Sequence, residues 1–185
     1  TNQTFDRFLS ALTEQEVTQR DLNRQRQALK AAHFPLLKEL ADFDFSAIPQ
    51  LNKQRILDLA RGEYLHQKMP ILLVGNPGLG KTHVATGLAA AACRQGYRVR
   101  FYNAAALVNE LVEAADDRQL SRVVGRYARL DLLLLDELGY VQIDARGAEL
   151  RHQRVAVAVH HQAGQAVGFA VHQTQAVAGD AHALA

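Results

Sequence analysis

The sequence predicts an α/β fold in which helices flank a parallel sheet and a small helical region precedes it. Two short aliphatic runs, residues 71–74 and 132–135, have the composition of strands that are covered on both faces. Segments with helical periodicity lie between these runs, as in strand-helix-strand units. A glycine-rich segment joins the first strand to its helix, and 185 residues suffice for one such core with a small appendage.

The composition is that of a packed globular protein, with 48% hydrophobic and 22% charged residues. Lysine and arginine number 21 against 19 aspartates and glutamates, so binding to nucleic acid has to come from local clusters of charge. Cys93 is the only cysteine, which excludes an intrachain disulfide and a thiol zinc site. No apolar run reaches the roughly 20 residues that span a bilayer, and no secretion signal is recognisable, so we expect a cytoplasmic protein without a membrane partner.

Residues 1–68 are predicted to be helical. Four apolar side chains near the start have the spacing of one helix face: Phe5, Phe8, Leu9 and Leu12. Pro35 is expected to interrupt the helix, because proline has no N–H to donate. A loop with apolar side chains follows, and a second helix is predicted from about Asn52.

Basic residues form two stripes at helical spacing. The first stripe pairs residues four apart in the N-terminal region: Arg20 with Arg24, and Arg26 with Lys30. The second stripe follows later in the chain: Arg118, Arg122, Arg126 and Arg129. Either stripe is a candidate for contact with DNA phosphates, and the second also for contact with a neighbouring subunit. Such runs commonly just face water, and the sequence leaves both interpretations open.

The elements of the core follow in order after Pro70. The aliphatic run 71–74 is predicted to be a central strand, and a helix should extend from Gly80 to about Gln95, ended by Gly96. Residues 97–102 are rich in β-favouring side chains and predict a second strand. Helices over 103–115 and 120–130 precede the strand 132–135.

Residues 75–82, GNPGLGKT, match the phosphate-binding pattern GxxxxGK[ST] between a strand and a helix. Glycines let the backbone fold into a nest of N–H groups, to which the helix N-terminus adds positive potential. A glycine-rich turn without a ligand is the alternative, but it would not require Lys81 or Thr82. Lys81 would reach the β- and γ-phosphates of ATP, and the Thr82 hydroxyl would be a ligand of Mg²⁺. The predicted nucleotide-binding residues are Gly75, Asn76, Pro77, Gly78, Leu79, Gly80, Lys81, Thr82 and His83.

Two acidic residues, Asp136 and Glu137, end the aliphatic strand at 132–135. Ligands of open α/β sheets gather at the carboxyl ends of strands, where the phosphate-binding loop also lies. Asp136 would bind Mg²⁺ and Glu137 would polarise the water that attacks the γ-phosphate. A helix N-cap is the alternative for an acidic residue in this place. Lys81 and Glu137 are therefore the predicted catalytic residues, and hydrolysis is favoured over kinase chemistry because a second acid suits the positioning of water.

With these motifs, the chain resembles IstB-like transposition helper ATPases of the AAA+ class, and next to them helicase loaders of the DnaC type. The resemblance covers about residues 5–150 and is carried by the P-loop, by THVATGLAAAACRQGYRVRFYNAAALVNEL, by LDLLLLDELGYVQIDARGAEL and by LKAAHFPLLKELADFDFSAIPQLNKQRILDLA. It implies an AAA+ core that forms ATP-dependent homo-oligomers on duplex DNA. It also implies that the N-terminal region helps to hold DNA and that the ATPase recruits and stimulates a transposase.

The sequence changes character at about residue 150. Beyond Glu149 the only charged residues are Arg151, Arg154 and Asp180, and five of the eight histidines lie there. We interpret this part as an out-of-frame or truncated reading of the gene, which the coding DNA in the other frames tests. The predicted divisions are a helical, candidate DNA-binding region over 1–68, an ATPase core over 69–150, and an atypical tail over 151–185.

The resemblance implies one more strand, ending in a sensor side chain that is usually asparagine, between the P-loop strand and the strand of Asp136. It also implies an arginine that reaches the neighbouring subunit. Neither residue can be assigned here, so we expect the C-terminal part of the core to be incomplete. Residues 155–159 and 166–171 are apolar enough to replace the strand. His160 and His161 are expected in an exposed tail rather than at a metal, because neighbouring residues of a strand point to opposite faces.

The functional prediction is an ATP-binding, ATP-hydrolysing helper that binds duplex DNA and assists a transposase. A helicase loader of the DnaC type is the first alternative, distinguished by a preference for single-stranded DNA. A remnant that binds nucleotide or DNA without hydrolysis is the second, because the sensor and the trans-acting arginine would supply part of the transition-state stabilisation.

Overall fold

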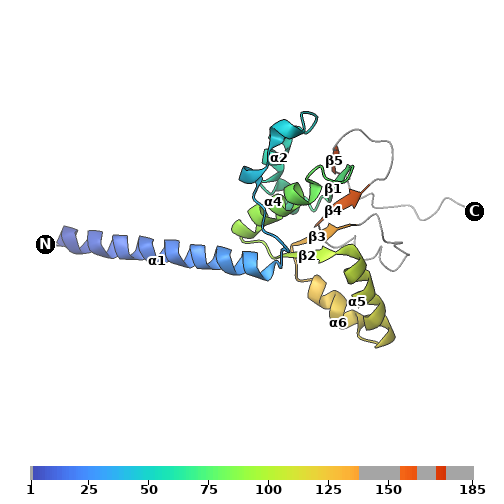
Figure 1. Ribbon diagram of the computed structural model, residues 1–185. Helices are drawn as coiled ribbons and strands as arrows, with labels where there is room; N and C mark the ends of the chain where they lie inside the picture. Colours follow the sequence, from blue (N-terminus) through green and yellow to red (C-terminus); the bar gives the residue numbers. More distant parts are fainter. Residues whose placement is uncertain (1, 138–154, 162–169, 174–185) are drawn as a thin grey trace, which may run out of the picture.

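A five-stranded sheet in the order β2-β3-β4-β1-β5 forms the centre of the protein in the computed structural model (Figure 1). The structure describes residues 2–137, 155–161 and 170–173. The strands are β1 (Ile71–Gly75), β2 (Val99–Asn103), β3 (Leu132–Asp136), β4 (Val155–His161) and β5 (Ala170–Gln173). The helices are α1 (Asn2–Ala31), α2 (Lys53–Leu59), α3 (Glu63–His66), α4 (Lys81–Arg94), α5 (Ala104–Asp116) and α6 (Leu120–Tyr127), with 3₁₀ turns at Leu40–Asp42 and Phe45–Ala47.

β4 fills the middle of the sheet, because it pairs in parallel with β1 on one side and with β3 on the other. The first of the two apolar runs proposed as a replacement, residues 155–159, therefore occupies the central position. Of the second run, residues 166–171, only 170 and 171 are among the described residues, and they belong to β5, which pairs antiparallel with the side of β1 away from β4. His160 and His161 are in register with Val74 and Gly75, so the backbone of these histidines lies in the sheet, and the expectation of a separate tail is wrong for them. The change of composition at residue 150 lies outside the described residues.

The leucines of β3 pack on two opposite faces of the sheet, as the uninterrupted aliphatic run predicted. Leu132 and Leu134 belong to the main core, which α4 shares, whereas Leu133 packs with Leu107 of α5 and Tyr127 of α6. The strand is thus covered by α4 on one face and by α5 and α6 on the other. This packing on both faces fixes the orientation of β3 and so the position of the carboxylates at its C-terminal end.

Helix α4 begins directly at the glycine-rich segment and is buried along most of its length. Gly80 is its N-cap at φ 74°, and Gly96 follows its end at φ 91°, a conformation that suits glycine. The N–H of Tyr97 donates to the carbonyl of Ala92, so Tyr97 belongs to the helix end and β2 starts only at Val99. Cys93 is fully buried on α4, and burial raises the pKa of its thiol to about 11.

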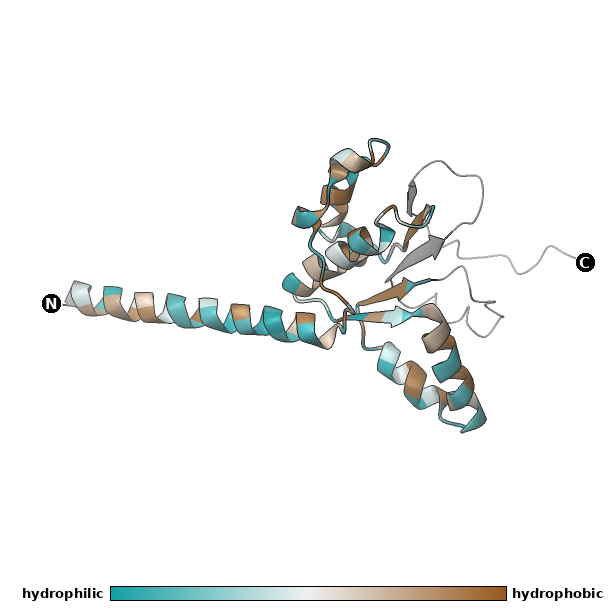
Figure 2. Cartoon of the chain, in the orientation of Figure 1, coloured by the Kyte–Doolittle hydropathy of each residue, from teal (hydrophilic) through white to brown (hydrophobic). Residues whose placement is uncertain are grey.

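Helix α1 extends away from the sheet as a single long rod, and its colouring in Figure 2 alternates between polar and apolar along much of its length. Its predicted apolar face is exposed, with 63% exposure at Phe5 and 60% at Phe8. The helix ends at Ala31, before Pro35, and α2 starts at Lys53, close to the predicted start at about Asn52, which is its N-cap and accepts from the N–H of Arg55 through its side chain. Among residues 2–137, 155–161 and 170–173, no helix has the length and apolar character that crossing a membrane requires.

Candidate functional site

The phosphate-binding loop connects β1 to α4 at the carboxyl edge of the sheet. Gly78 and Gly80 both have left-handed backbones, at φ 81° and 74°, which turn the chain sharply into the helix. The side chain of Lys81 is 2% exposed, and its Nζ donates to the carbonyl of Asn76 over 2.6 Å. Pro77 and Gly78 are exposed at the tip, and Leu79 packs against the core. The lysine side chain therefore lies across the loop. From this position its ammonium group can exchange the carbonyl of Asn76 for a phosphate oxygen as hydrogen-bond acceptor.

Burial of Lys81 lowers the pKa of its ammonium group, and the charge of Asp136 opposes this shift. Lys81 is the first residue of α4 and Asp136 is the last residue of β3, so the P-loop and the end of β3 share one electrostatic environment. A triphosphate in the loop would add negative charge beside the ammonium and favour its protonated form.

Thr82 and Asp136 are in direct contact, as the two predicted motifs require. The Thr82 hydroxyl lies 3.1 Å and 3.3 Å from the two carboxylate oxygens of Asp136 and donates to this group. A hydroxyl and a carboxylate are hard oxygen donors, which Mg²⁺ prefers together with water and phosphate oxygens. These two residues therefore fit a magnesium ion that is bound with a nucleotide.

Glu137 directly follows β3 and has φ 61°, a left-handed backbone that is uncommon for a residue with a side chain. Its carboxylate accepts a hydrogen bond from the Nδ2 of Asn103 over 2.5 Å. The Oδ1 of Asn103 meanwhile accepts from the N–H groups of Ala105 and Ala106, which caps α5. One side chain thus holds both a helix start and the predicted catalytic acid.

Asn103 is a site residue that the sequence pattern alone did not identify. It ends β2 and lies in register with Asp136 in the neighbouring parallel strand. The rule that ligands collect at the carboxyl ends of parallel strands could have selected it, once β2 and β3 were recognised as neighbours. What was missing was the strand order, which the local pattern does not contain.

His83 lies on the first turn of α4 but its ring contacts protein groups. Its Nε2 is 2.8 Å from the carbonyl oxygen of Glu39, and the ring packs edge-on against Phe43 with 5.2 Å between centroids. Phe43 also lies against Gly80, where an added Cβ would come within 2.7 Å of the ring. Segment 39–43 thus forms one wall beside the P-loop, and nucleotide contact by His83 stays a prediction.

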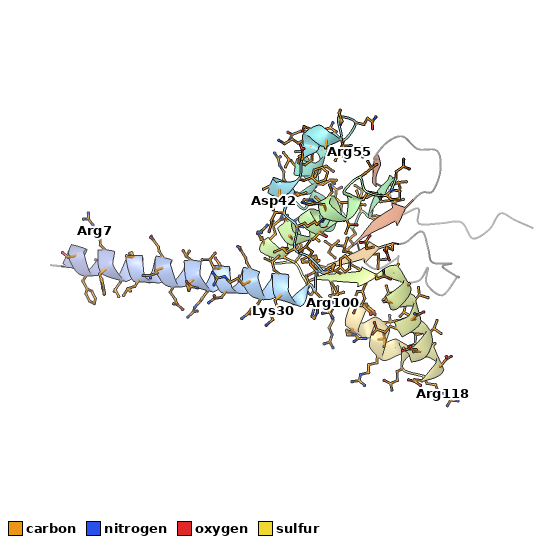
Figure 3. The ribbon with its side chains drawn as sticks, in the orientation of Figure 1. Arg7, Lys30, Asp42, Arg55, Arg100 and Arg118 are labelled. Atoms are coloured by element: carbon orange, nitrogen blue, oxygen red, sulfur yellow. The ribbon has the colours of Figure 1, made fainter. Side chains whose placement is uncertain are left out.

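The basic stripes are exposed and are partly neutralised within the chain. On α1, Arg20 pairs with Glu16 over 2.7 Å and Arg24 pairs with Asp21 over 3.5 Å. In the second stripe, Arg126 is paired with Glu110. Figure 3 shows Arg118 at the far end of the pair α5 and α6, and Lys30 close to the root of α1. Within the two stripes, the exposed residues for which no ion pair is described are Arg26, Lys30, Arg118, Arg122 and Arg129.

The model of a protein family described as IstB-like ATP binding protein matches residues 1–173. Over 160 residues the chain is 31% identical to a protein of Geobacillus stearothermophilus that is named as an ATP-binding protein of insertion sequence IS5376, with 86% of this chain and 64% of that protein covered. A similarly named insertion sequence protein of Sinorhizobium fredii is 38% identical over 139 residues, covering 75% of this chain and 47% of that protein. A third, from insertion sequence IS232 of Bacillus thuringiensis subsp. berliner, is 34% identical over 151 residues, with 82% and 60% covered.

The chain spans about half to two thirds of the length of these relatives, from 47% to 64%. The family match also continues past residue 150, where the sequence resemblance was expected to end. Among solved structures, AMPPCP-bound DnaA from Aquifex aeolicus aligns with a TM-score of 0.55 at 21% identity, covering 68% of this chain and 42% of that one. The structure of DnaI aligns with a TM-score of 0.51 at 16% identity, covering 72% and 74%. These likenesses show the P-loop AAA+ fold predicted from the sequence.

Proposed function

The chain belongs to the IstB-like ATP binding protein family, and from this membership we propose that it binds ATP with Mg²⁺, hydrolyses ATP and assists a transposase on duplex DNA. The observation that carries the proposal is the contact between Thr82 and Asp136 beside the buried Lys81. Residues from the start of α4 and from the end of β3 meet there, which supports a site for a magnesium-bound triphosphate.

In this proposal the P-loop holds the phosphates with backbone N–H groups at the start of α4. Lys81 would leave the carbonyl of Asn76 and bind the β- and γ-phosphates, and Thr82 and Asp136 would hold the magnesium ion. When bound, this ion would neutralise part of the charge that develops on the phosphate oxygens. Glu137 accepts a proton from the attacking water, and Asn103 holds the carboxylate through the bond of its amide.

Nucleotide binding is supported by residues that lie in the described part of the chain. Hydrolysis also depends on the sensor and on the trans-acting arginine that the family resemblance implies. β4 lies between β1 and β3, where the resemblance implies a sensor strand, and its last two residues are His160 and His161 instead of asparagine. We therefore propose that this chain binds ATP firmly and turns it over slowly.

Duplex DNA and a transposase are the proposed partners, and ATP-dependent association with further copies is the proposed assembly. The support for DNA is the group of exposed basic residues on α1, on α6 and in the turns that flank α6, because counterion release by such residues drives binding to phosphates. The support for a transposase is the relation to insertion sequence proteins at 31% to 38% identity. The likeness to DnaI extends to the fold alone, so it does not favour the helicase-loader alternative.

The experiment is release of inorganic phosphate from ATP by the purified chain, measured with and without duplex DNA and compared with Lys81→Ala. We expect release that duplex DNA stimulates and that the variant loses. Single-stranded DNA as the better stimulator would favour the helicase loader. Binding of ATP without any release, under all of these conditions, would favour the non-hydrolysing remnant.

A further inference from the structure

Residues 32–48, which we call the strap, connect α1 to the body of the protein along one face of α4. Phe43 of the strap lies against Gly80 and His83, and Leu40 lies against Gly87. Glu39 forms a two-point ion pair with Arg94, in which Nη1 and Oε2 are 2.7 Å apart. Positions 80, 83, 87 and 94 recur at helical spacing, so these contacts form a line along α4 from the P-loop to the last helical residue.

The first residues of the strap are tied to the sheet at the root of α1. The carbonyl of Ala32 accepts from the N–H of Phe101 over 2.9 Å, and the carbonyl of Ala31 accepts from Arg100 over 3.1 Å. Figure 3 places Lys30 and Arg100 together at this root and Asp42 farther along, beside α4. The strap therefore begins where α1 ends and packs directly against α4, the helix that carries Lys81 and Thr82.

Two of these contacts have no free space. A Cβ at Gly87 would lie 2.7 Å from the side chain and 3.0 Å from the backbone nitrogen of Leu40. A Cβ at Gly80 would lie 2.7 Å from the ring of Phe43. Packed interiors transmit displacement instead of absorbing it. A shift of the strap therefore has to move α4, or to separate the strap from the P-loop.

We propose that the strap couples α1 to the nucleotide site, with the ion pair of Glu39 and Arg94 as its latch. Binding of a ligand to α1 changes the packing of Phe43 against the P-loop and so changes the affinity for nucleotide. By thermodynamic reciprocity, binding of nucleotide changes the affinity of α1 for its ligand. The identity of that ligand, duplex DNA, rests on the proposed function. The latch itself rests on the contacts of residues 39–43.

The test is a comparison of DNA affinity with and without a magnesium complex of a non-hydrolysable ATP analogue. We expect the analogue to change the Kd for duplex DNA by about 5-fold or more, in the range typical of allosteric coupling. Glu39→Ala and Arg94→Ala should each bring the ratio of the two Kd values close to one. The exchanged pair E39R/R94E should restore the ratio. Arg98→Ala is the matched control, because Arg98 forms a similar two-point pair with Asp131, a residue outside the strap, and it should keep the wild-type ratio.

A second measurement does not require DNA. Amide hydrogen exchange in residues 28–48 should slow when the analogue binds to the wild type, and should slow less in Arg94→Ala, although the analogue still binds. Two results would overturn the inference. One is a wild-type ratio of the two Kd values in folded Glu39→Ala or Arg94→Ala, and the other is amide hydrogen exchange in the strap that does not change when the analogue binds. Failure of the wild type to bind the analogue at all would instead contradict the proposed function, and failure to bind DNA with an intact exchange response would contradict only the assignment of the ligand.

Discussion

The side-chain amide of Asn103 donates to the Oε2 of Glu137 over 2.5 Å, although 34 residues separate the two in the chain. The contact exists because β2 and β3 are parallel neighbours that end at the same edge, with Asn103 in register with Asp136. Asn103 also caps α5 through its Oδ1. The position of the predicted catalytic acid is therefore tied to the first turn of a helix on the opposite face of the sheet from α4.

Replacing Asn103 by aspartate is predicted to lower kcat for ATP hydrolysis while ATP affinity changes little. Aspartate remains a good N-cap for α5, but its carboxylate faces Glu137 and repels it. If Glu137 acts as the general base, its displacement removes part of a contribution of about 10²- to 10⁴-fold. Steady-state phosphate release at several ATP concentrations measures kcat and KM separately. An unchanged kcat in a variant that melts like the wild type would show that Asn103 does not position Glu137.

Replacing Thr82 by valine is predicted to weaken the binding of ATP in the presence of Mg²⁺ much more than in its absence. Valine has a similar shape but lacks the hydroxyl that lies 3.1 Å from Asp136 and would contact the metal. Calorimetric titration with ATP in magnesium and in EDTA measures both affinities. Thr82→Ser restores the hydroxyl and should restore the magnesium effect; equal losses with and without metal would contradict a role of Thr82 as a ligand.

Alanine substitutions at two helical glycines, one beside the strap and one with open space around it, test how tightly the strap packs against α4. A Cβ added at Gly125 of α6 would meet no atom within 4 Å, so Gly125→Ala should stabilise the fold by up to about 1 kcal/mol through helix propensity. Gly87→Ala has the same propensity gain, but its methyl group meets Leu40 at 2.7 Å, and we expect net destabilisation by roughly 1–3 kcal/mol. Urea denaturation of both variants measures the difference. Equal stabilisation by both would show that the strap does not press on α4.

The ion pair at the latch predicts a dependence of stability on pH. The hydrogen bond from Arg94 lowers the pKa of Glu39 below its ordinary value of 4.5, with burial opposing and the charge of Arg94 assisting this shift. The resulting stability is fully present above pH 4.5 and is lost as the pH falls through the folded-state pKa. Because both side chains are partly exposed, we expect a contribution of about 1 kcal/mol or less.

The measurement is the difference in free energy of unfolding between the wild type and Arg94→Ala, determined at several pH values. The difference should be constant at neutral pH and should shrink once Glu39 becomes protonated. A difference that grows toward acid pH, or that does not change with pH, would contradict this account of the pair.

Local sequence was sufficient for the elements that carry their own signal. The glycines around Lys81 predicted the turn into α4, and Gly96 predicted its end, because positive φ is a property of the residue itself. The uninterrupted leucines of β3 predicted a strand covered on both faces, which α4 on one side and α5 with α6 on the other confirm. The meeting of Thr82 with Asp136 followed from the same motifs.

The local sequence pattern did not predict the contacts between residues that lie far apart in the chain. The contact of Asn103 with Glu137 depends on which strand lies beside β3, and the wall formed by Phe43 depends on the path of the strap back to Gly80. Two similar apolar runs near the C-terminus were candidates for one central position, and composition did not distinguish them. Pairing did, since residues 155–161 lie between β1 and β3 whereas the described residues 170–173 pair with β1 alone.

The most direct test of the account is calorimetric titration of the purified chain with a non-hydrolysable ATP analogue in the presence of Mg²⁺, beside Lys81→Ala. We expect saturable binding of one nucleotide per chain. We also expect an affinity roughly 10- to 100-fold lower in the variant, because a charge-assisted hydrogen bond to phosphate contributes about 1.5–3 kcal/mol. No binding to the folded wild type, or equal affinity in the variant, would contradict the claim that the P-loop and the acidic end of β3 hold one magnesium-bound triphosphate.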